Sequence, residues 1–218
     1  MKSFNWLLVL SVLSCIGCSS PVHEDGRGCA FVSDSIQYRV EFMSAGCVRI
    51  LSFPEGDTLV TKRLVGDSEK PAFKDYKWED TGQKLLFRTR ELSVVFDKAD
   101  AAFIFQETST GKLLLKEKGD RKARNFKRSV AGGEQCLEVT QRFVPTEDEA
   151  IYGLGQYQNG IMNYRGKSVL LLQANMDIVN PFLISTNGYG VLWDNYSSTK
   201  FEDTKEGYSF TSEVGDAS

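Results

Sequence analysis

The chain has 218 residues, of which 41% are hydrophobic and 25% are charged, and its net charge is −3. This balance is typical of a globular protein and leaves enough chain for one large domain or two small ones. The slight acidic excess excludes a broad nucleic-acid-binding surface.

The N-terminus has the form of a secretory signal. Lys2 precedes an apolar run from Phe4 to Ile16, which is too short to span a bilayer. Ile16-Gly17-Cys18 resembles the end of a bacterial lipobox, so we expect cleavage after residue 17 and a lipid on Cys18. An ordinary signal peptide, or lipidation at Cys15, is the alternative. Residues 18–28 would then be a tether, and a lipid-anchored protein would lie at the outer membrane, on its periplasmic face or at the cell surface.

Few residues in the body of the chain suit metal or nucleophilic chemistry. His23 is the only histidine and falls in the tether, so no Ser-His-Asp or Cys-His set can form in the folded part. Cys29, Cys47 and Cys136 lack metal-ligand spacing. A disulfide between Cys29 and Cys47 and buried free thiols both remain open. We expect neither a metal nor a cofactor.

The pattern of the remaining chain predicts many short strands. Residues 36–42 alternate apolar and polar side chains, and a small-residue turn leads to a second strand from Cys47, which predicts a hairpin. Further strands are expected from Lys84, Leu92 and Ala101. Thr110-Gly111 is typical of a second hairpin turn.

Strands are also predicted from Cys136 to the proline at 145, and in the apolar runs after residues 167, 180 and 187. No stretch has convincing helical periodicity. Turns every ~8–12 residues favour an all-β fold, an antiparallel β-sandwich. Residues 54–80 and 118–133 are expected to be loops. The basic run from Arg121 to Arg128 within the latter is expected to be solvated.

The run from Ala150 to Gly166 combines four glycines with tyrosines and amides. It lacks the spacing of a phosphate loop and has no helix after it, so we exclude an anion site there. Asp194, beside a tryptophan, is the one aspartate that suggests a glycosidase nucleophile, but glycoside hydrolysis needs a second carboxylate nearby. We interpret Asp194 as a strand-end residue.

The segment from Glu149 to Phe201 resembles the N-terminal β-sandwich of glycoside hydrolase family 31. Glu149-Ala150-Ile151-Tyr152-Gly153-Leu154-Gly155 is similar to the family's YGLGE stretch, with Gln156 in place of the usual glutamate. Asn163-Tyr164-Arg165-Gly166 and the run from Asn180 to Leu192 resemble the polar loop and strands that follow. Weaker similarity extends upstream to Cys47-Val48-Arg49-Ile50 and to Thr110–Leu114.

The resemblance implies a galactose-mutarotase-like domain, covering 29–218, of a retaining α-xylosidase or α-glucosidase that acts on oligosaccharides. In this family the domain lends a loop to the substrate pocket of a C-terminal catalytic barrel, which carries an aspartate nucleophile and an aspartate acid/base. The glycines would let the loop approach the barrel. Gln173, Asn175 and Asp177 are the expected substrate-binding residues. Tyr152 and Leu154 are expected in the core.

Nothing in this chain matches the family's nucleophile motif, so we expect no catalytic residue here and a catalytically silent fragment. The sandwich is expected to be incomplete at its C-terminus, with an unpaired edge near Phe210 to Val214. One alternative is a carbohydrate-binding surface lipoprotein without catalysis, with Tyr157, Tyr164 and Trp193 in an exposed row. The other is a purely structural lipoprotein.

Overall fold

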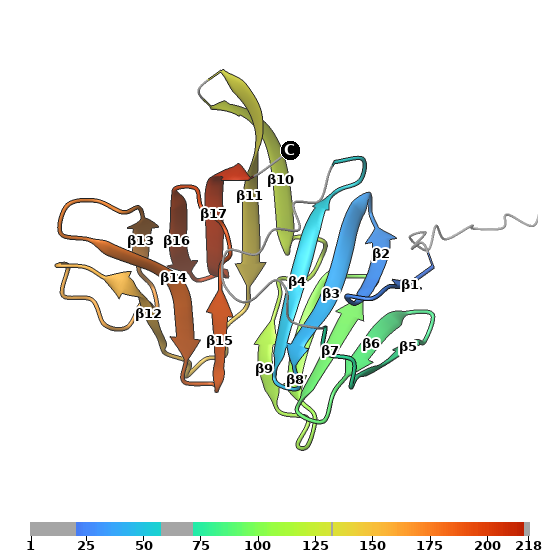
Figure 1. Cartoon of the computed structure of the whole chain (residues 1–218). Coiled ribbons are helices and arrows are strands. Elements are labelled where there is room, and N and C mark those ends of the chain that lie inside the picture. Colours follow the sequence, from blue (N-terminus) through green and yellow to red (C-terminus); the bar gives the residue numbers. More distant parts are fainter. Residues whose placement is uncertain (1–20, 58–71, 132, 216–218) are drawn as a thin grey trace, which may run out of the picture.

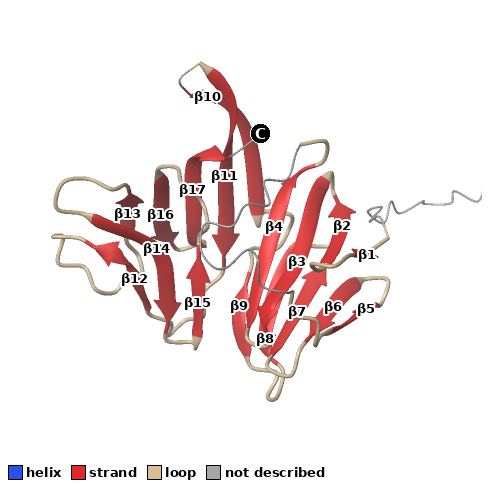
Figure 2. Ribbon diagram, viewed as in Figure 1, coloured by secondary structure: helices blue, strands red, loops and turns tan. Residues whose placement is uncertain are grey.

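The computed structural model describes residues 21–57, 72–131 and 133–215. The described residues form antiparallel strands and no helix, which confirms the expected all-β fold (Figure 2). The signal-like segment, including Cys18, lies outside the described residues. Within them, no helix long and apolar enough to cross a membrane is found.

The N-terminal half of the chain forms two sheets in which neighbours in sequence are neighbours in space. The first contains β1 (His23–Glu24), β2 (Cys29–Ser33), β3 (Ile36–Ser44) and β4 (Cys47–Pro54). The second contains β5 (Lys77–Asp80), β6 (Lys84–Arg88), β7 (Leu92–Asp97), β8 (Ala102–Glu107) and β9 (Leu113–Lys116). We call these two sheets the N-terminal lobe. Both predicted hairpins, β3–β4 and β8–β9, are confirmed.

The C-terminal half forms two further sheets, which we call the C-terminal lobe. One has the order β10-β11-β17-β16-β13 and the other the order β12-β14-β15. Their strands are β10 (Arg124–Ala131), β11 (Glu134–Phe143), β12 (Ile151–Gln156), β13 (Ser168–Leu171), β14 (Ile178–Ser185), β15 (Tyr189–Leu192), β16 (Thr199–Thr204) and β17 (Gly207–Gly215). Figure 1 shows β12, β14 and β15 as one layer over β13, β16 and β17.

Each lobe buries its own core between its two sheets. Alternation explains the N-terminal core: Phe31 and Tyr38 point inward from one sheet and meet Phe87, Phe96 and Phe103 from the other. Phe143, Tyr208, Phe201 and Phe210 hold the C-terminal core, with Trp193 stacked on Phe210 at 5.4 Å between ring centroids. Aromatic pairs at such distances contribute about 0.5–1.5 kcal/mol beyond area burial.

A buried ion pair joins the two lobes. Nη1 of Arg124, at the start of β10, donates to Oε2 of Glu117 at 2.7 Å, and its Nε donates to Oγ of Ser52 at 3.1 Å. Its guanidinium lies 5.1 Å from the Tyr38 ring centroid. Burial raises the pKa of Glu117, and the adjacent guanidinium opposes that rise. Glu117 also bridges to Phe143, which connects the lobes through the backbone.

Three expectations are wrong. Residues 118–133 are not all loop, because β10 pairs with β11 over Arg124 to Ala131. The basic run is not wholly solvated, because Arg124 is buried against Glu117. The stretch from Phe210 onward is not an edge: β17 pairs with β11 on one side and β16 on the other, so it is the central strand of its sheet.

The expected loop at 54–80 is partly outside the described residues, and its last four residues form β5. Glu24 and Asp25, from the expected tether, are attached to the N-terminal lobe. The Glu24 carboxylate accepts hydrogen bonds from Tyr76 and Trp78, and Asp25 pairs with Arg39 at 2.7 Å. The three described cysteines are free thiols, with Cys29 and Cys136 buried and Cys47 exposed.

Candidate functional site

The glycines of β12 are explained by the close approach of β14. Gly153 and Gly155 have φ of 101° and 119°, in the region that favours glycine. A Cβ on Gly155 would lie 2.1 Å from the carbonyl oxygen of Ile178. The glycines are therefore needed because the backbone of β14 passes close to them. The register shifts between the two glycines and turns Leu154, with φ of 64°, into the core. Tyr152, expected in the core, is 38% exposed.

The pairing of β12 with β14 brings two polar turns together. Gln156 lies opposite Ile178, so the turn that begins at Tyr157 adjoins the turn that ends at Asp177. The Tyr157 hydroxyl donates to the Leu154 carbonyl at 3.0 Å. Burial, together with Tyr164 and the Asp177 carboxylate, raises the pKa of Tyr157 to about 12. We call residues 156–163 and 172–177 the polar rim.

The predicted substrate-binding residues all lie on the second turn of this rim. Gln173 shapes the turn: its Nε2 donates to the Asp177 carbonyl at 2.8 Å, and its Oε1 accepts from the Val179 N–H at 3.1 Å. Asn175 is exposed and Asp177 is half-buried. The structure therefore places Gln173, Asn175 and Asp177 on one turn. The Gln173 side chain stabilises that turn through its two hydrogen bonds to the backbone.

The aspartate of the WDN stretch is part of a contact between the lobes. Asp194 Oδ2 lies 3.4 Å from Nη2 of Arg49 on β4. Its neighbour Trp193 donates from Nε1 to Oγ of Ser212 at 2.8 Å and stacks on the core. This environment matches the interpretation of Asp194 as a strand-end residue.

The aromatic residues proposed as a sugar-binding row do not form one. Tyr164 is buried, with 3% of its surface exposed, and Trp193 packs on Phe210. Tyr157 is half-buried and bonded to its own turn. The expected row is wrong because these rings contribute to the C-terminal core and its margin.

A buried carboxylate that sequence reasoning did not single out, Glu149, organises the start of β12. Its Oε1 accepts from Oγ of Ser185 at 2.6 Å and from the Tyr189 hydroxyl, and its Oε2 accepts from the Thr146 N–H at 2.8 Å. The Tyr189 hydroxyl also contacts that of Tyr208 at 3.0 Å. Burial, and then the bond to Glu149, raise the pKa of Tyr189. Glu149 is the first residue of the segment that resembles family 31, and this resemblance is the signal that could have identified it.

The polar loop at 163–166 is tied to the same region. Oδ1 of Asn163 accepts from the Ile151 and Arg165 N–H groups, both at 3.1 Å. Arg165 donates from Nε to Oδ2 of Asp203 at 2.9 Å and from Nη1 to the Glu149 carbonyl at 2.6 Å. These bonds attach the loop to β12 and β16.

The buried carboxylates of the described residues all have protein partners. Glu117 pairs with Arg124, Asp203 with Arg165 and Glu41 with Arg49, while Glu149 accepts the hydrogen bonds given above. Within the described part of the chain, no cluster of three or more metal-binding side chains occurs.

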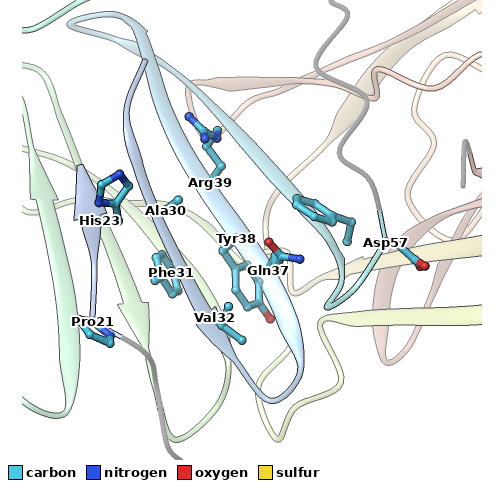
Figure 3. A pocket seen from close by; sticks show the side chains of 10 residues that line it. Pro21, His23, Ala30, Phe31, Val32, Gln37, Tyr38, Arg39 and Asp57 are labelled. Carbon is cyan, nitrogen blue, oxygen red and sulfur yellow. The ribbon is translucent and has the colours of Figure 1, made fainter. Parts of the chain in front are cut away.

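A separate depression lies on the N-terminal lobe (Figure 3). Its volume is about 380 Å³, and it is lined by residues of β1–β3, including Phe31 and Tyr38, with Pro21, Phe53 and Asp57. It contains His23 and Arg39 but none of the residues of the polar rim. It is therefore separate from the candidate site.

Comparison with known proteins gives the family. Residues 37–202 match the model of the glycosyl hydrolase 31 N-terminal galactose mutarotase-like domain. The chain belongs to this family. An α-xylosidase from Saccharolobus solfataricus is 33% identical over 178 residues, which are 75% of this chain and 23% of that protein.

Solved structures with the same fold include a family 31 enzyme. The α-xylosidase of Xanthomonas citri superposes with a TM-score of 0.72 at 31% identity, over 84% of this chain and 20% of its own. A cycloalternan-forming enzyme from Listeria monocytogenes, solved with a pentasaccharide substrate, has a TM-score of 0.73 at 21% identity, which shows the fold alone. It covers 91% of this chain. This chain therefore spans about a fifth of the length of each of these three proteins.

Proposed function

We propose that this chain is the N-terminal domain of a retaining α-glycosidase, an α-xylosidase or α-glucosidase that acts on oligosaccharides. The observation that carries the proposal is the match over residues 37–202 together with 33% identity to an α-xylosidase. In this proposal the domain supports the substrate pocket of a C-terminal catalytic barrel and is itself catalytically silent.

The proposed silence is supported by the state of the carboxylates. A retaining glycosidase needs two carboxyl groups about 5–5.5 Å apart on either side of the scissile bond. The buried carboxylates described above are each committed to a protein partner, and Asp194 pairs with Arg49. These buried carboxylates therefore contribute to the fold and are not free to act on a sugar as an acid and a base.

The polar rim is the part of the domain that we propose reaches the pocket. Amides suit hydroxyl-rich ligands because they both donate and accept hydrogen bonds without carrying charge. Asn175 and Asp177 are accessible, and Gln173 holds their turn in shape. Asn175 and Asp177 would then contact the sugar, and Gln173 would act by positioning them.

An exchange of domains tests this role. Residues 21–215 replace the matching part of the Xanthomonas citri α-xylosidase, and hydrolysis of nitrophenyl α-xyloside is measured. The exchanged enzyme should turn over, and Asn175→Ala or Asp177→Ala should raise KM by about 2- to 10-fold, because one lost hydrogen bond costs about 0.5–1.5 kcal/mol. Unchanged kinetics in both variants would assign the rim to the scaffold alone.

The isolated chain provides the matching test of silence. Residues 21–218 should hydrolyse neither nitrophenyl α-xyloside nor nitrophenyl α-glucoside. Turnover that disappears in Asp194→Asn would overturn the proposal and make the WDN stretch catalytic.

We also propose that the chain is exported and anchored in the outer membrane by a lipid on Cys18. The support is the apolar run that ends in Ile16-Gly17-Cys18. Labelled fatty acid should enter the full chain and not Cys18→Ser. Label that persists in Cys18→Ser would place the lipid elsewhere, with Cys15 as the next candidate.

A further inference from the structure

The β12–β14–β15 sheet has an unusual composition for an exposed sheet. None of the residues in its three strands is charged, in a chain that is 25% charged overall. An antiparallel sheet with one solvated face normally alternates apolar residues inward with polar residues outward. This sheet instead presents apolar residues on both faces.

Its inner face needs no further explanation. Ile151, Leu154 and Leu183 point into the C-terminal core and are fully buried. The outer face carries five large apolar side chains that are between 37% and 57% exposed, and we call them the apolar face: Tyr152, Ile178, Phe182, Ile184 and Leu192.

The register makes the apolar face continuous. Tyr152 lies directly opposite Ile184, and Phe182 lies directly opposite Leu192. A Cβ on Gly190 would lie 2.7 Å from Cζ of Phe182, so the Phe182 ring lies over that glycine. The result is an apolar surface that extends across three strands, and exposed apolar surfaces of this kind mark interaction sites.

The opposite side of the same lobe is different. On the outer side of β16, Lys200 pairs with Glu202 at 2.8 Å, and Leu170 of β13 lies beside Lys200 in the register. Charged side chains therefore interrupt the apolar ones on that side. Of the two outer sides of the C-terminal lobe, the β12–β14–β15 side is the one without charge.

We propose that the apolar face is the surface against which the catalytic domain of the longer family 31 relatives docks. This inference rests on the proposed function. The occupant follows from length: the relatives are about four to five times as long as the segment that matches this chain, so each has a further domain to pack against it.

The position of the polar rim fits the same occupant. Ile178 belongs to the apolar face and directly follows Asp177, and it lies opposite Gln156 at the start of the rim. A domain seated on the apolar face would therefore meet the rim at the margin of the contact. A free sugar fits this face less well, because its outward positions on β14 offer only Asn180 among Ile178, Phe182 and Ile184.

Ile184→Asp tests the proposal, with Leu170→Asp as the matched control, because the two side chains are 52% and 50% exposed on opposite sides of the lobe. Both are first made in the isolated chain. Neither should shift its melting temperature by more than about 2 °C, because neither side chain belongs to a core. Ile184→Asp should also lower any binding of a hydrophobic dye.

Both substitutions are then made in the exchanged Xanthomonas citri enzyme. Ile184→Asp should reduce the activity that survives heating by about tenfold or more and should split one melting transition into two, because a buried charge would separate the domains. Leu170→Asp should change the surviving activity by less than about twofold.

Equal effects of the two substitutions, or no effect of Ile184→Asp, would overturn the proposal. So would an exchanged enzyme that does not fold, because the chain would then not fit the domain position. Loss of self-association in the isolated chain without an effect in the exchanged enzyme would assign the face to a second copy. If the exchanged enzyme is active and tolerates Ile184→Asp, the docking proposal fails and the proposed function stands. If the exchanged enzyme folds but is inactive, and Ile184→Asp still splits its melting transition, the proposed function fails and the docking proposal stands.

Discussion

The two lobes bury aromatic cores of the same kind but are built by different routes. In the N-terminal lobe every pair of adjacent strands is also adjacent in the sequence. In the C-terminal lobe β11 pairs with β17, and β13 pairs with β16. The first lobe is therefore assembled from local hairpins, and the second requires strands that are distant in the chain to meet.

The lobes also differ in what their interiors contain. The N-terminal lobe has an aromatic core, and its buried polar groups are bonded separately: Thr89 to the Ala45 carbonyl and Glu117 to Arg124. The C-terminal lobe adds a buried set of polar groups, Glu149, Ser185, Tyr189 and Tyr208, whose hydrogen bonds hold β12, β14, β15 and β17 in one arrangement. Both lobes therefore bury specific polar contacts, and those of the C-terminal lobe form one network that links four strands.

The sharpest way to separate the lobes is a glycine substitution in each. Gly155→Ala should cost about 2–6 kcal/mol, because left-handed strain and overpacking each cost about 1–3 kcal/mol. Gly82 in the N-terminal lobe has φ of 85°, and no atom lies within 4 Å of an added Cβ. Gly82→Ala should therefore lower the free energy of unfolding by only about 1–2 kcal/mol. Urea unfolding measures both. Equal losses would contradict the close approach of β12 and β14.

Removal of one partner of the ion pair between the lobes should lower stability nearly as much. Arg124→Met leaves the Glu117 carboxylate buried without its cation, so the free energy of unfolding should fall by about 3–5 kcal/mol. Arg128→Met, at an exposed position on the same strand, should change it by less than about 0.5 kcal/mol. Adding Glu117→Leu to Arg124→Met should restore part of the loss, and a purely additive double variant would show that the two groups are not coupled.

A smaller loss is expected from the polar set of the C-terminal lobe. Tyr189→Phe removes the hydroxyl that donates to Glu149 and leaves a buried oxygen short of one donor, which should cost about 1–3 kcal/mol. Tyr196→Phe is the control, because Tyr196 is 77% exposed. Thermal unfolding monitored by circular dichroism compares them. Indistinguishable midpoints would mean that the polar set does not stabilise the lobe.

The contact of Asp194 with Arg49 should matter less. Asp194→Asn weakens an ion pair near the surface, which should cost no more than about 1 kcal/mol. The loss should shrink in 1 M salt, because salt screens such pairs. A loss above about 2 kcal/mol that is independent of salt would identify Asp194 as a buried structural group.

The cysteines report on both lobes without changing stability. In residues 21–218, a thiol reagent at pH 8 should label Cys47 first, because it is the exposed thiol of the three although partial burial raises its pKa, and should label Cys29 and Cys136 only on unfolding. Burial raises the pKa of Cys29 to about 11, so little thiolate is present at pH 8. Mass spectrometry of the labelled peptides identifies the site. Rapid labelling of Cys29 in the native state would show that the N-terminal core opens readily.

Two hairpins of the N-terminal lobe were predicted because their signals are local, whereas β1, β2 and β5 were not predicted. The alternation over residues 36–42, the small turn before Cys47 and the turn at Thr110-Gly111 each specify a hairpin from a few consecutive residues. The lobe's register follows from the same alternation, because a slip of one residue would turn every core side chain outward.

The family resemblance located the candidate site, and the tertiary structure decided what its residues do. The glycine-rich stretch, the polar loop at 163–166 and the turn at Gln173 were all identified in the sequence. Their contacts were not: the glycines make room for β14, and Gln173 closes its own turn. Such contacts join residues whose proximity exists only after β12 and β14 have paired.

Composition and short-range pattern were enough for the all-β class, the N-terminal hairpins and the family, because each depends on residues close together in the chain. Pairing over long sequence distances decided the rest. Arg124 of the basic run is buried because Glu117 neutralises it, and β17 became a central strand because β11 reaches it from about 70 residues away. The apolar face likewise arises only when three strands align their outward residues. A partner's position in space, which a linear pattern does not contain, determines whether a charge is buried or an apolar residue is exposed.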